Sequence, residues 1–141
     1  LGDEPLDDTF NGDRLHAQTR GKTAAIKTHI MNQRYLVGVG NIYATEALFA
    51  SGIHPARAAD SLSRADCGRL ADAIKSVLRA AIEQGGTTLR DFTHPDGTHG
   101  YFAQTLAAYG KSGEPCPRCQ RPLQNMVING RSTVYCPYCQ E

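Results

Sequence analysis

The stretch Cys116-Pro117-Arg118-Cys119, followed sixteen residues later by Cys136-Pro137-Tyr138-Cys139, decides how the last quarter of the chain folds. Each C-x-x-C pair turns two sulfurs toward one point, and Zn²⁺ prefers four soft ligands in a tetrahedron. The spacing therefore predicts one structural Zn²⁺, with no coordination position left for a catalytic water. Its predicted ligands are Cys116, Cys119, Cys136 and Cys139.

A β-hairpin is predicted between the two cysteine pairs. Asn129-Gly130 is the dipeptide typical of a type I′ turn, in which both central residues have positive φ. β-branched and aromatic residues flank it on both sides. The hairpin would carry the second cysteine pair at its end.

Other uses of these cysteines are less well supported. Two disulfides would suit a cysteine-rich secreted chain, but only 5 cysteines occur in 141 residues. A zinc deaminase shares the P-C-x-x-C stretch but also needs H-x-E, and none of the 5 histidines is followed two places on by Glu. The cysteine usage favours a reducing, cytoplasmic compartment. The remaining cysteine, Cys67, is interpreted as a small buried residue.

Charge is unevenly distributed, although the net charge is only +1. Residues 1–13 contain five acidic side chains and no basic one, and residues 14–57 contain six basic side chains and one acidic one. The basic block could face a polyanion or form an ordinary solvated helix surface. The charge pattern alone leaves both possibilities open.

Apolar residues three and four positions apart predict helices before the zinc site. In the second helix, Lys27 falls off the apolar stripe and is expected to face outward. In the last helix, Ser63 and Asp66 form a capping box at the start, and Ile82 belongs to the apolar stripe. The predicted helices span residues 11–20, 23–33, 41–51 and 63–84.

A glycine-containing turn joins the second and third helices. Gly38 and Gly40 precede Asn41, which opens the third helix. Unpaired N–H groups at a helix start bind phosphate, and glycines let the phosphate approach. A close helix crossing that tolerates only glycine would give the same pattern, so both interpretations stay open.

The third region of interest is a long loop at residues 87–100, rich in Gly, Thr, Pro and Asp. Long loops of this kind are often functional lids. His94 and His99 in it could bind metal, but four cysteines already complete a site.

Three motifs in this order resemble the C-terminal part of bacterial formamidopyrimidine-DNA glycosylase. They are Gly38-Val39-Gly40-Asn41-Ile42-Tyr43-Ala44, Gly85-Gly86-Thr87-Thr88-Leu89-Arg90-Asp91-Phe92, and the four-cysteine ribbon. The resemblance implies a mainly α fold with a small β part. A helix–two-turn–helix domain at residues 14–110 would precede a zinc finger at 111–141. It also implies excision of oxidised purines from double-stranded DNA, followed by cleavage of the abasic strand.

The resemblance assigns contacts to individual residues. Lys27 and Asn41 match positions that hold the phosphates flanking the lesion, and Arg131 matches the finger arginine that reaches the same backbone. A loop that closes over the everted base matches Leu89, Arg90, Asp91 and Phe92.

The chain departs from the family at its start. The family's nucleophile is an N-terminal proline followed by a glutamate, whereas this chain begins Leu1-Gly2 and Pro5 is internal. We expect residues 1–13 to be a linker from a missing N-terminal catalytic domain, and the polypeptide as given to be an inactive monomer. A lysine nucleophile and a zinc-ribbon module for protein interaction are the competing hypotheses.

Overall fold

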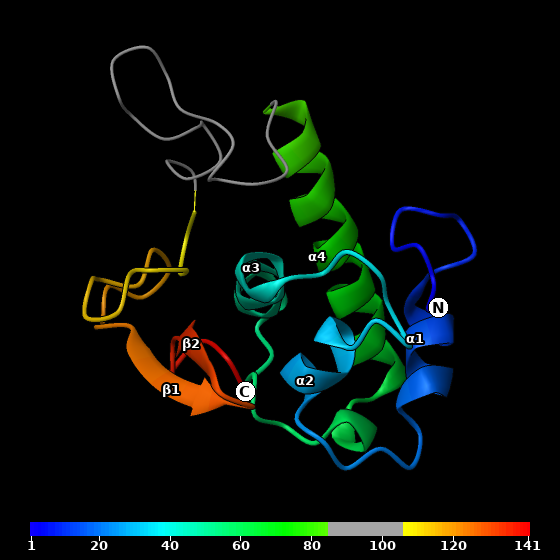
Figure 1. Cartoon of the computed structure of the whole chain (residues 1–141). Coiled ribbons are helices and arrows are strands. Elements are labelled where there is room, and N and C mark those ends of the chain that lie inside the picture. The colour runs from blue at the N-terminus through cyan, green and yellow to red at the C-terminus, as the bar shows by residue number, and fades with distance from the viewer. Residues whose placement is uncertain (85–105) are drawn as a thin grey trace.

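The computed structural model describes residues 1–84 and 106–141 (Figure 1). These ranges form a mainly helical fold with one small sheet, which confirms the predicted fold class. The elements are α1 (Gly12–Thr19), α2 (Ile26–Met31), α3 (Asn41–Ser51), a 3₁₀ helix η1 (Ala59–Ser61), α4 (Arg64–Glu83), β1 (Gln124–Ile128) and β2 (Arg131–Tyr135). Every helix in these ranges is too short or too polar to cross a membrane.

Helix ends follow the local sequence signals in two cases. α3 spans the predicted residues and ends at Gly52, which has a φ of 74°. α4 begins after Ser63, whose side chain accepts from Asp66 N while the Asp66 carboxylate accepts from Ser63 N. The predicted capping box is therefore confirmed.

α2 is shorter than predicted. Ala25 pairs with Ala58 in an antiparallel bridge, and Ala59 N donates to Ala24 O at 2.8 Å. This pairing holds Ala25 at a ψ of 141°, outside the helical range, so the helix starts at Ile26. Long-range backbone pairing has overridden the local helical pattern.

The main core lies where α1 and α3 pack on α4, and α3 lies between α4 and the hairpin (Figure 1). Leu15, Leu48 and Leu70 are fully buried there, as is Cys67, in agreement with its predicted role. Ile82 was predicted to join this core but is 54% exposed. It lies on the last turn of α4, where the neighbouring Ala81 supplies the buried contact instead.

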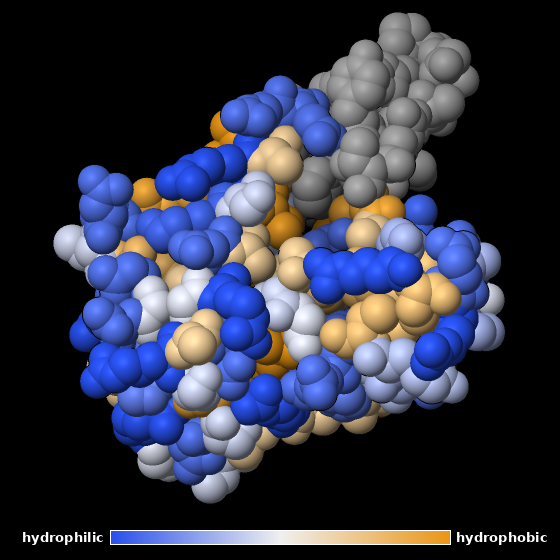
Figure 2. Space-filling view, turned by 180° about the vertical axis from the view of Figure 1, so that it is seen from behind, coloured by the Kyte–Doolittle hydropathy of each residue, from blue (hydrophilic) through white to orange (hydrophobic). Residues whose placement is uncertain are grey.

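Residues 1–13 are docked on the helical body. Asp3 N donates to Tyr35 O at 2.9 Å, Val37 N donates to Asp3 O at 3.0 Å, and Phe10 is fully buried. Seen from behind, the surface is mostly hydrophilic, with small separated apolar areas (Figure 2).

The zinc-site hairpin has the predicted turn. Asn129 and Gly130 have φ values of 49° and 76°, and Ile128 pairs with Arg131 across them. A second apolar cluster joins the finger to α3 through Phe49, which packs with Leu123 and Val134. This separate cluster therefore attaches the finger to α3.

His29 is expected to make the folding stability of the chain depend on pH. It is buried between the Tyr35 ring at 4.2 Å and Gln18 Oε1 at 3.3 Å from its Nε2. Burial, with a smaller effect of Lys22, lowers the pKa of His29 to about 4. The unfolded chain takes up this proton near pH 6.5, so folding stability is complete above that pH and falls between about 6.5 and 4. The loss should reach about 3 kcal/mol.

Urea titrations of the wild type and His29→Phe at several pH values would measure this dependence. The phenyl ring keeps the stacking on Tyr35 but cannot titrate. Equal slopes of stability against pH in both proteins would contradict the assignment.

Candidate metal centre and nucleic-acid interface

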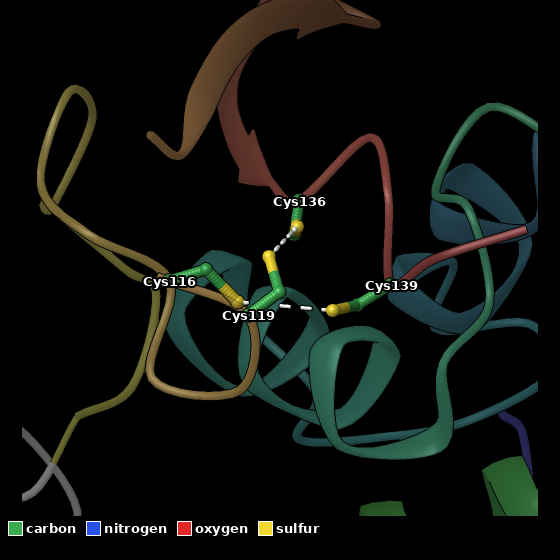
Figure 3. A group of neighbouring side chains, drawn as sticks. All are labelled: Cys116, Cys119, Cys136 and Cys139. Atoms are coloured by element: carbon green, nitrogen blue, oxygen red, sulfur yellow. Dashed lines mark hydrogen bonds between the residues drawn. The ribbon is translucent and has the colours of Figure 1, made fainter. Parts of the chain in front are cut away.

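The four predicted cysteines converge on one point (Figure 3). Cys116 and Cys119 come from the loop before β1, and Cys136 and Cys139 follow β2. Their sulfur atoms all lie within 4.8 Å of one another. Two of the distances are 3.9 Å, between Cys116 Sγ and Cys139 Sγ, and 3.6 Å, between Cys119 Sγ and Cys136 Sγ.

These distances fit a zinc ion and not disulfides. Four Zn–S bonds of about 2.3 Å in a tetrahedron place the sulfurs about 3.8 Å apart, whereas a disulfide needs about 2.05 Å. None of the 5 cysteines of the chain is in a disulfide. The donor set fits one structural Zn²⁺.

Lys27 was predicted to lie on the surface, but the structure buries it. It is only 1% exposed, and its ammonium donates to Thr133 Oγ1 at 2.6 Å and Ser132 O at 3.2 Å. Both acceptors belong to β2, more than a hundred residues away in sequence. The prediction from the apolar stripe failed because β2 accepts hydrogen bonds from Lys27 on a face of α2 that lies outside the stripe.

Asn41 binds the same carbonyl as Lys27. Its Nδ2 donates to Ser132 O at 3.0 Å, so α2, α3 and β2 meet at one oxygen atom. Asn41 is 9% exposed, and its Oδ1 has no hydrogen-bond partner among the described residues. A buried amide oxygen of this kind is costly unless a water or ligand satisfies it.

Arg131 lies next to the residue whose carbonyl Lys27 and Asn41 share. It starts β2, directly before Ser132, and its side chain is exposed. Burial, and to a smaller extent the charge of Arg131, lowers the pKa of Lys27 to about 8. A cavity of about 280 Å³ separates α2 from the hairpin turn. It is lined by Lys27, Thr28, Met31, Asn32, Ile128, Asn129 and Arg131.

The two glycines of the turn before α3, Gly38 and Gly40, differ in backbone conformation. Gly38 has a φ of 81°, which favours glycine, whereas Gly40 has a φ of −90°. A Cβ at either position would meet no atom of residues 1–84 and 106–141 within 4 Å, so a tight crossing of the described helices does not explain them. The space beside the first turn of α3 is open.

Glu46, which is 7% exposed on α3, has a structural role that no sequence pattern indicated. Its carboxylate accepts from the backbone N–H groups of Ala107, Ala108 and Tyr109 at 2.7, 2.9 and 2.8 Å. Every residue except proline has a backbone N–H, so these donors cannot be recognised from residue types. In the sequence Glu46 stands out only as the single acidic residue of the basic block at residues 14–57.

The structure thus brings together Lys27, Asn41 and Arg131, and separately the four cysteines. The predicted lesion loop, Leu89 to Phe92, lies outside the described residues, as do His94 and His99.

The helices and the cysteine cluster define a helix–two-turn–helix domain joined to a four-cysteine zinc finger. The family described as "Formamidopyrimidine-DNA glycosylase H2TH domain" matches residues 1–93, and "Zinc finger found in FPG and IleRS" matches residues 113–141. The chain belongs to the formamidopyrimidine-DNA glycosylase family. It is 56% identical over 140 residues to the formamidopyrimidine-DNA glycosylase of Teredinibacter turnerae and 55% identical over 140 residues to that of Stenotrophomonas maltophilia. Each match covers 99% of this chain and 52% of the relative, so the chain spans about half of these proteins.

Solved structures are similar over the same extent. MutM (Fpg) of Thermus thermophilus has a TM-score of 0.88 and 42% identity, covering 99% of this chain and 53% of that one. The Lactococcus lactis Fpg in complex with DNA containing an abasic site has a TM-score of 0.89 and 33% identity, covering 100% of this chain and 52% of that one.

Proposed function

We propose that this chain is the DNA-binding half of a glycosylase and abasic-site lyase that removes oxidised purines from DNA. Its role is to hold the phosphates that flank the lesion. The observation that carries the proposal is that Lys27 and Asn41 both donate to the Ser132 carbonyl, next to Arg131, which lines the same cavity as Lys27. Related proteins with this fold have been solved with damaged DNA bound.

The chemistry of this site suits a phosphate. Two side-chain donors lie here, the exposed Arg131 guanidinium and the Asn41 amide, and a helix start such as that of α3 presents backbone N–H groups. The open space at Gly40 would let a sugar–phosphate strand reach those N–H groups. Such contacts position a duplex but do not read its sequence.

The family relationship supplies the rest of the proposal. Residues Leu89, Arg90, Asp91 and Phe92 would cover the everted base, and an N-terminal catalytic domain of the same protein would supply the chemistry. The protein would act as a monomer. The bacterial relatives and cysteines that form no disulfide support a cytoplasmic location.

Fluorescence anisotropy with a duplex containing a tetrahydrofuran abasic-site analogue tests the proposal. With about three phosphate contacts, log K should fall against log[salt] with a slope of roughly −2 to −3. Arg131→Ala should weaken binding about tenfold on every duplex sequence and make the slope shallower by about 0.9.

The matched control is Arg64→Ala. Arg64 is an exposed arginine at the start of α4 that pairs with Asp13 of α1. α1 lies across the molecule from the hairpin (Figure 1). Its removal should leave binding within about twofold of the wild type. Absence of duplex binding at low salt would overturn the proposal, and binding of a protein partner instead would favour an interaction module.

A further inference from the structure

Lys27 is linked to the backbone of Arg131 by two routes. Its Nζ donates to Thr133 Oγ1 at 2.6 Å, and that hydroxyl in turn donates to Arg131 O at 3.1 Å. Its Nζ also donates to Ser132 O, the carbonyl next in the chain. The carbonyl oxygens of Arg131 and Ser132 are thus held, directly or through one hydroxyl, by a single ammonium.

Lys27 lines the cavity beside Arg131, but its ammonium is bonded to β2 and has little exposed surface for a direct salt bridge to DNA. The side chain is 1% exposed and Thr133 is fully buried. Two of its three N–H groups have β2 acceptors, so its geometry is set by the hairpin. The lowered pKa of Lys27 agrees with a cation enclosed by protein and kept near another cation.

We propose that Lys27 is a positioning residue, which acts on DNA through the backbone of Arg131 and not as a phosphate ligand. The proposal rests on the function proposed above, in which Arg131 holds a phosphate. Arg131 stands directly after the Asn129-Gly130 turn, where it pairs with Ile128 at the end of a two-stranded hairpin, an arrangement that is marginally stable by itself. By holding both carbonyls, Lys27 fixes the direction in which the Arg131 side chain leaves the strand.

A double-mutant cycle on the zinc-loaded chain distinguishes the two roles, because only residues that act together are non-additive. Affinities for the tetrahydrofuran duplex are measured for wild type, Lys27→Met, Arg131→Ala and the double variant. Methionine keeps the length and the buried packing of the side chain but donates no hydrogen bond. Lys27→Met should weaken binding about fivefold in the wild type and less than about twofold in the Arg131→Ala background.

Thr133→Val tests the same chain of hydrogen bonds from the hairpin side. It keeps the proposal testable if Lys27→Met fails to fold. It removes the hydroxyl that joins Lys27 to Arg131 O, and it should also lose its effect when Arg131 is alanine. Lys75→Met is the matched control: Lys75 Nζ donates to Asp7 O at 2.8 Å on the α4 surface, and its replacement should leave affinity unchanged. One zinc per chain and an unchanged helical circular dichroism signal establish that each variant is folded.

Two results would overturn the proposal. If Lys27→Met weakens binding by the same factor with and without Arg131, Lys27 contacts DNA independently and only this inference fails. If Arg131→Ala binds like the wild type, the phosphate role of Arg131 in the proposed function fails as well.

Discussion

Removal of zinc is expected to unfold residues 113–141 and abolish DNA binding, while most of the helical signal remains. Structural zinc in small fingers contributes on the order of 10 kcal/mol of folding free energy, more than a two-stranded hairpin can replace. The main core contains no finger residue among those described. The finger cluster meets the helices mainly at Phe49, so α3 should lose contacts without melting.

Chelator titration followed by circular dichroism at 222 nm, with zinc release recorded in parallel, measures this result. Cys119→Ser should behave like the chelated protein. Cys67→Ser is its control, because Cys67 is buried in the helical core and should leave one zinc per chain. Loss of the whole helical signal together with zinc would contradict the expected independence of the helical core.

Glu46→Ala is expected to destabilise the chain by about 4 kcal/mol. The substitution leaves three backbone N–H groups, at Ala107, Ala108 and Tyr109, without their acceptor, and each unpaired buried donor costs about 1–3 kcal/mol. Glu46→Gln should cost less, because the amide still has one oxygen to offer, but its NH₂ group would face an N–H donor.

Urea unfolding at neutral pH compares these variants with Glu83→Ala, an exposed glutamate at the end of α4. The control should change stability by less than about 0.5 kcal/mol. A Glu46→Ala midpoint close to that of the control would mean that Glu46 does not anchor residues 107–109.

Local patterns in the sequence predicted the elements that depend on local physics. The zinc ligands follow from the spacing of two tight turns, and the hairpin turn from the positive φ that Asn129-Gly130 allows. α3 and the start of α4 were also predicted, because a glycine and a capping box mark their ends.

The relations between elements could not be predicted in this way. Lys27 was assigned to the surface because periodicity describes one face of a helix and carries no information about a hairpin that packs on another. Glu46 has backbone partners, which any sequence provides. The late start of α2 depends on Ala58, far along the chain. In each case the contacting residue is distant in sequence, and its residue type does not indicate the contact.

The sharing of one carbonyl by Lys27 and Asn41 constrains how the segment between them can evolve. Exposed side chains there, such as Gln33 and Arg34, can change, provided that the buried apolar residues stay apolar and Gly38 keeps its φ of 81°. An insertion or deletion would rotate α3 against α2 and pull the two donors off Ser132 O. Natural variants of this segment should therefore differ by substitution and keep a constant length.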